Sequence, residues 1–112
     1  MQMKVLQLRL LGEFQAVIGD LPIENFPTDK IRALLAYLAA EADRLHARTH
    51  LATLLWSEWD EAAARANLRK SLFRLRKTLG ETAESLLTIT RSSVQLHSET
   101  AVIDVLRFEQ LS

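Results

Sequence analysis

Residues 65–80, RANLRKSLFRLRKTLG, contain six basic residues and no acidic residue. The whole chain of 112 residues nevertheless has a formal net charge of zero, because its 14 Lys and Arg are matched by 14 Asp and Glu. Electrostatic affinity for phosphate groups depends on clustered Lys and Arg rather than on the total charge. The basic segment is therefore the first candidate for a binding surface, with a polyanion as its natural ligand.

Apolar residues in this segment have the spacing of an amphipathic helix over residues 60–79. At about 100° per residue, one narrow stripe collects Ala64, Leu68, Leu72, Leu75 and Leu79. Gly80 is a natural stop, and Phe73 lies nearly opposite the stripe, among the basic side chains. Like charges recur four residues apart in this helix, and each such pair costs roughly a few tenths of a kcal/mol. We therefore expect an anionic partner to compensate the charge.

The rest of the chain predicts an α+β fold, with residues 1–112 as a single domain. Residues 1–24 alternate with period two, which favours an antiparallel β-meander with turns at Gly12-Glu13 and Gly19-Asp20. Residues 28–80 have the spacing of three helices. The first is expected from Thr28, its N-cap, to Ala42. The second is short and expected to be capped by Thr49, with these side chains pointing inward: Leu51, Leu54 and Leu55.

Residues 86–103 predict a wing hairpin after the basic helix. A two-residue turn at Arg91-Ser92 would pair Ile89 with Val94 and Leu87 with Leu96, so that the apolar side chains share one face. A last short strand would include Val102 and Ile103, and residues 104–112 have the pattern of a helix that starts a following segment. A short helix, an interruption, a basic helix and a hairpin follow one another as in a winged helix-turn-helix.

Composition excludes several classes of protein. The chain is 48% apolar and 25% charged, which suits one globular domain. It has no cysteine, so disulfides and thiolate sites are excluded, and only three glycines, with no phosphate-binding loop. His46 and His50 lack a nearby third ligand, so we expect no metal. Ser, His and Asp residues are present but scattered along the chain, so we expect no enzyme activity and no cofactor. No long apolar run is present, and we expect a soluble, cytoplasmic protein without membrane contact.

Three residues of the basic helix are expected to read bases. Lys70 and Arg74 have long basic side chains that can donate to guanine O6 and N7. Asn67 either reads an adenine or forms a hydrogen bond within its own helix. Phe73 contacts either a thymine methyl group or a protein partner.

Other basic and polar side chains are expected to hold phosphates. On the basic helix these are Arg65, Arg69, Arg76 and Lys77, and Thr49 would add a contact from the second helix. Arg65 and Arg76 have a second interpretation, which is pairing with acids of neighbouring elements. At the tip of the wing, Arg91 and Ser92 would reach the neighbouring phosphates or the minor groove.

Four stretches together resemble the N-terminal DNA-binding domain of SARP-type bacterial transcriptional activators, a variant of the OmpR-like winged helix. They cover nearly the whole chain in the family's order: LRLLGEFQ (8–15), ALLAYLAAEADRLHARTHLATLLW (33–56), ARANLRKSLFRLRKTLG (64–80) and LLTITRSSVQLHSETAVIDVLRFE (86–109). Two stretches depart from the family pattern. The loop SEWDE (57–61) has no proline, and the wing TRSSV (90–94) has no glycine.

The resemblance implies a function and a set of partners. It implies binding to double-stranded DNA at direct repeats upstream of promoters, in the nucleoid, and recruitment of RNA polymerase partly through loop 56–60. It implies base reading by Arg74 and phosphate contacts by Arg76 and by the indole of Trp56. It also implies a helical activation domain that would begin near residues 108–112.

A different class of function also fits the charged helix. Residues 60–79 could dock an acidic protein partner, with Phe73 as the buried anchor. A winged helix serves either purpose, so the fold alone does not decide between them.

Overall fold

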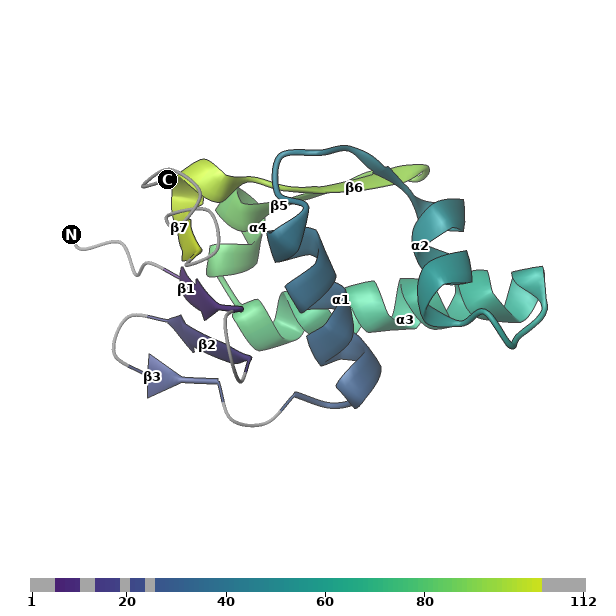
Figure 1. Cartoon of the computed structure of the whole chain (residues 1–112), viewed down its shortest axis with the longest axis horizontal. Coiled ribbons are helices and arrows are strands. Elements are labelled where there is room, and N and C mark those ends of the chain that lie inside the picture. The colour runs from purple at the N-terminus through teal and green to yellow at the C-terminus, as the bar shows by residue number, and fades with distance from the viewer. Residues whose placement is uncertain (1–5, 11–13, 19–20, 24–25, 104–112) are drawn as a thin grey trace.

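The computed structural model describes residues 6–10, 14–18, 21–23 and 26–103, which form an α+β fold with two small sheets around three main helices (Figure 1). The predicted fold class is confirmed. In chain order the elements are β1 (Leu6–Arg9), β2 (Gln15–Ile18), β3 (Leu21–Pro22), α1 (Asp29–Ala40), β4 (His46–Ala47), α2 (Arg48–Leu55), α3 (Glu61–Leu79), α4 (Thr82–Leu86), β5 (Leu87–Ile89), β6 (Ser93–Leu96), η1 (Ser98–Thr100) and β7 (Ala101–Ile103).

The N-terminal strands form the predicted antiparallel meander. β1 pairs with β2 and β2 with β3, with Leu6 opposite Ile18 and Leu8 opposite Ala16. Leu6, Leu8 and Ala16 are buried, so the period-two pattern turns its apolar face to the core. The turns predicted at residues 12–13 and 19–20 lie outside the described residues.

The segment predicted as the wing, 86–103, divides in the structure. Only β5 and β6 form the hairpin, with the predicted register of Leu87 opposite Leu96 and Ile89 opposite Val94. Residues 101–103 instead form β7, which pairs parallel with β1 in the other sheet, order β3-β2-β1-β7. This pairing buries Ile103 and requires a long crossover, which the helices supply. The hairpin pairs with β4 in a sheet of order β4-β6-β5.

The first two helices differ from their predicted forms at several residues. The Oγ1 of Thr28 caps α1 as predicted, accepting from the Ile31 amide at 3.2 Å, but α1 ends at Ala40 rather than Ala42. Thr49 is not a cap: α2 begins at Arg48, directly after β4, and its N-cap residue is Ala47. Because β4 ends at Ala47 and α2 follows it directly, the helix begins one residue before Thr49. Leu54 is 46% exposed rather than inward.

Helix α3 has the predicted amphipathic form. The side chain of Asp60 accepts from the Ala63 amide at 2.8 Å and caps its start, while Gly80 ends it with φ of 61°. The whole predicted stripe is buried, together with Ser71. α4 was not predicted, because five residues are too few to show a helical period, and it buries Ala83 and Leu86.

Asp43 joins the connection after α1 to the end of β6 and to the segment that follows it. Its backbone amide donates to the Leu96 carbonyl at 2.7 Å, and its own carbonyl accepts from Gln95 Nε2 at 2.9 Å. Its carboxylate accepts from both the hydroxyl and the amide of Ser98. These two hydrogen bonds hold the pKa of Asp43 below its ordinary value of 3.8, and the bond from the Ser98 hydroxyl has the larger effect.

The charge of Asp43 should make stability depend on acid pH. Because the folded-state pKa is lowered, the contribution is fully present above pH 3.8 and is lost as the pH falls through the lower folded value. Asp43→Asn keeps a residue that tolerates the observed φ of 70° and removes the charge together with one of the two acceptor oxygens. Urea unfolding should show the wild type more stable at neutral pH and the difference shrinking below pH 3.8. A difference independent of pH would contradict the assignment.

Candidate nucleic-acid interface

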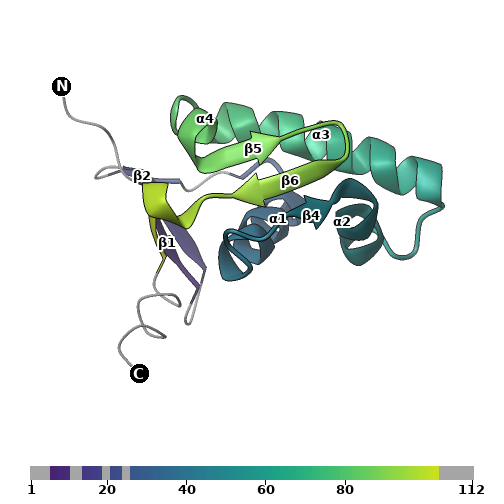
Figure 2. The ribbon, with the colours of Figure 1, turned by 90° about the horizontal axis from the view of Figure 1, so that it is seen from above.

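The first half of α3, the start of α2 and the tip of the β5–β6 hairpin surround one groove, and Figure 2 shows α2 near the hairpin tip. A groove of about 690 Å³ opens between these three elements. Four arginines line it: Arg48 from α2, Arg65 and Arg69 from α3, and Arg91 from the tip of the hairpin. Thr49 and Ser92 also line this arginine groove, so several predicted phosphate contacts from separate elements meet in one place.

Arg48 fixes the hairpin to α2 and was not among the predicted site residues. Its amide donates to the Ser92 carbonyl at 2.9 Å, and its Nε donates to the Thr90 carbonyl at 2.7 Å. In the sequence, the only indication of a role for Arg48 is that it is a basic residue directly before Thr49. Its partners are more than forty positions away, so their proximity could not be inferred locally.

The hairpin turn closes without the glycines that the family pattern has there. Thr90 Oγ1 accepts from the amides of Ser92 and Ser93 at 3.2 and 3.0 Å, and the Thr90 amide donates to the Ser93 carbonyl at 2.9 Å. A side-chain oxygen thus satisfies the turn amides, as in other turns that a threonine stabilises. Arg91 and Ser92 are exposed at the tip.

A second groove, of about 280 Å³, lies on the other side of α3, against the start of α1. The three predicted base readers, Asn67, Lys70 and Arg74, all line this second groove. Its other lining residues are Thr28, Lys30, Trp56 and Ser71. Lys30 was not predicted; its Nζ donates to the Leu55 carbonyl at the end of α2. Trp56 is only 7% exposed and belongs mainly to the core. Asn67 forms the local bond considered for it, donating to the Ala63 carbonyl at 3.1 Å.

The basic side chains of α3 have no acidic partner within the part of the chain that the structure describes. The ion pair found there joins Arg44 to Glu41 at 3.1 Å, away from α3. The alternative interpretation of Arg65 and Arg76, pairing with acids of neighbouring elements, therefore finds no support among those residues. Among the described residues, the charge of α3 is therefore not balanced by any ion pair.

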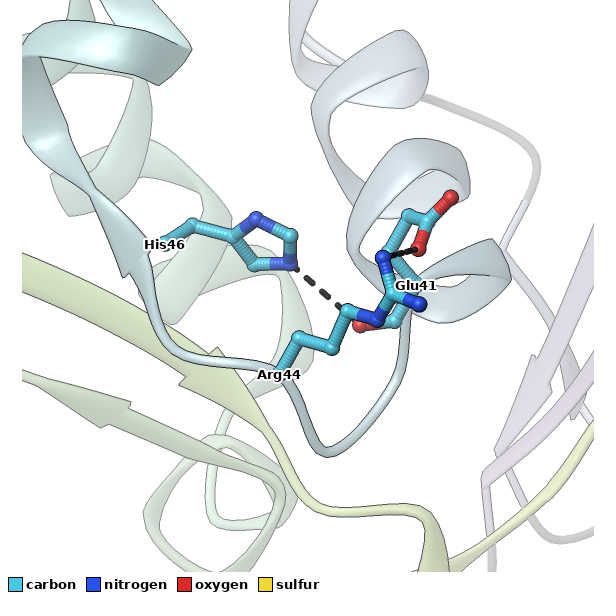
Figure 3. A network of polar contacts seen from close by, with 3 residues as sticks. All are labelled: Glu41, Arg44 and His46. Carbon is cyan, nitrogen blue, oxygen red and sulfur yellow. Dashed lines mark hydrogen bonds and ion pairs between the residues drawn. The ribbon is translucent and has the colours of Figure 1, made fainter.

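The two histidines that raised the question of a metal lie in different surroundings, and Figure 3 shows the first of them, His46, with Glu41 and Arg44. His46 is 7% exposed, its Nε2 lies 3.3 Å from the Glu41 carbonyl oxygen, and its ring centroid is 5.4 Å from that of Tyr37. His50 is exposed on α2. Among the described residues, no group of three or more His, Asp or Glu side chains could hold a metal ion. No described helix is long and apolar enough to cross a membrane.

The chain is similar to known proteins in both sequence and fold. No family model matches it. The transcriptional regulatory proteins EmbR of Mycobacterium tuberculosis and Mycobacterium bovis are 39% identical to it over 77 residues, which is 69% of the chain and 20% of each EmbR. A solved structure of M. tuberculosis EmbR in complex with a low affinity phosphopeptide matches 94% of the chain and 28% of EmbR, with a TM-score of 0.77 and 33% identity.

The chain thus spans about a fifth of the length of the curated relatives that it matches. EmbR is named as a transcriptional regulatory protein, in agreement with the expectation that this chain is not an enzyme. The chain is therefore homologous over most of its length to EmbR, a regulator of the SARP family, and has the winged-helix fold of the EmbR N-terminal region.

Proposed function

We propose that the chain binds double-stranded DNA sequence-specifically and acts in a bacterial transcriptional activator. The homology to EmbR supports transcription regulation by DNA binding in general. The observation that carries the proposal for this chain is the basic face of α3. Its six cations have no acidic partner among the described residues, and four of them line the two grooves. Acting on promoter DNA, the protein would work in the cytoplasm, at the nucleoid.

In the proposed complex α3 lies in the major groove. The major groove of DNA is about 12 Å wide and admits one helix. The first half of α3 is slender because its side chains include the small Ala62, Ala63 and Ala66. Lys70, Arg74 and Asn67 would read base edges. The arginine groove would bind the phosphate backbone of the DNA next to the wing. Arg48 would contribute there together with the predicted residues Arg65, Arg69 and Arg91. Further contacts to the DNA phosphates would come from Thr49, Ser92, Arg76, Lys77 and the edge of Trp56.

Salt dependence tests this proposal directly. If four to six side chains contact phosphates, log affinity should fall with log salt at a slope of roughly −4 to −5. Arg69→Ala should reduce the slope by about 1. Arg44→Ala removes an equal charge outside the interface and should leave the slope unchanged. Binding that does not respond to salt would refute the proposal. Selection from random duplexes would supply the operator and show whether direct repeats are preferred.

The connection between α2 and α3 is a proposed contact for RNA polymerase. Trp59 is 57% exposed there, flanked by the acidic Glu58 and Asp60, and an exposed indole is a common interface anchor. In a chain joined to its activation domain, Trp59→Ala should lower transcription from a cognate promoter about tenfold or more while DNA affinity stays within about twofold. Parallel loss of DNA affinity would argue against a polymerase contact.

A further inference from the structure

Phe73 is the large apolar side chain that α3 leaves exposed. All residues of α3 are described, and its leucines are buried, whereas Phe73 is 60% exposed. Burying a phenylalanine side chain stabilises a protein by about 1.5–3 kcal/mol, so an exposed one forgoes that gain. The side chain does not serve the core, and its position on the basic face calls for an external contact.

The surroundings of Phe73 identify that contact as DNA. Lys77 Nζ lies 4.8 Å from the ring centroid, where a cation on the ring holds its orientation. Along the helix the neighbours of Phe73 at i−4, i−3, i+3 and i+4 are Arg69, Lys70, Arg76 and Lys77, so four cations surround it. A protein surface seated on the ring would have to satisfy four cations. In the major groove the phosphates of both strands do so, and the apolar group that the groove offers is the C5 methyl of thymine.

We propose that Phe73 is a specificity-determining residue that contacts the methyl group of one thymine in the operator. The inference rests on the proposed function and adds to it a particular base. Lys70 and Phe73 are three residues apart, which is about 4.5 Å along the helix axis. Base pairs are spaced by about 3.4 Å. The thymine should therefore lie one or two base pairs from the base that Lys70 reads.

Replacing single thymines by uracil tests the contact, because uracil lacks only the methyl group. The operator comes from the random-duplex selection, and each thymine is replaced in turn. At one position the wild type should bind the uracil duplex about fourfold more weakly, the value of one buried methyl group. Phe73→Ala should weaken binding to the thymine duplex by about that factor or more and remove the discrimination. Phe73→Leu, which keeps an apolar side chain, should retain part of it.

Leu45→Ala is the matched control, since Leu45 is a 68% exposed side chain outside α3. It should discriminate as the wild type does, and thermal melting should show all variants folded. The inference is overturned if no thymine shows a Phe73-dependent effect, or if Phe73→Ala weakens the thymine and uracil duplexes equally. Unchanged DNA binding by Phe73→Ala would instead assign the ring to a protein partner. All these outcomes leave the proposed function intact, whereas a wild type that binds no duplex refutes both.

Discussion

Leu75→Ala is expected to lower the free energy of unfolding by about 2–5 kcal/mol. Leu75 is fully buried in the C-terminal half of the α3 stripe, so the shorter side chain leaves a cavity where α3 packs on the core. Native domains are stable by only about 5–15 kcal/mol, so this change consumes a large fraction of the total. Urea unfolding at constant temperature, followed by circular dichroism, measures the loss.

Leu45→Ala deletes the same atoms from a side chain that is 68% exposed. It should change the free energy of unfolding by about 0.5 kcal/mol or less, because no cavity forms and little apolar contact is lost. The two variants delete the same atoms, one from a buried helical side chain and the other from an exposed side chain in a connection. Similar losses from both would show that the α3 stripe is not the packed core described above.

Arg74→Ala should relax the sequence preference of the protein, with a loss of about 1–3 kcal/mol on the cognate duplex and much less on unrelated duplexes. The physical reason is that a guanidinium donating to guanine O6 and N7 discriminates between bases. Arg74 lines the groove that also contains Asn67 and Lys70, so the proposed readers act from one side of α3. Titration of labelled cognate and scrambled duplexes at one salt concentration measures the difference.

Arg76→Ala is the paired variant, because it removes an identical side chain two positions away. A phosphate contact carries no sequence information, so its loss should weaken cognate and scrambled duplexes by the same factor. Both residues are exposed, and neither change should lower the melting temperature appreciably. Equal losses on every sequence from both variants would contradict the role proposed for Arg74.

Short-range patterns predicted most of the elements. Leucines at helical spacing placed the α3 stripe correctly, and alternation around residues 91–92 predicted the pairing of Leu87 with Leu96. Both are local properties, because the periods of 3.6 and 2 repeat within a few residues. Thr49 was wrongly predicted as a cap, since the position of a helix start here depends on the pairing of β4 with β6.

The sequence by itself determined that the chain contains one strongly basic amphipathic helix and the order of elements of a winged helix. Only the tertiary structure decided that β7 joins β1, that Arg48 holds the wing, and that α3 lies between an arginine groove and a groove containing Lys70 and Arg74. These contacts join residues tens of positions apart. Their formation depends on how the whole core packs, and no local period encodes it.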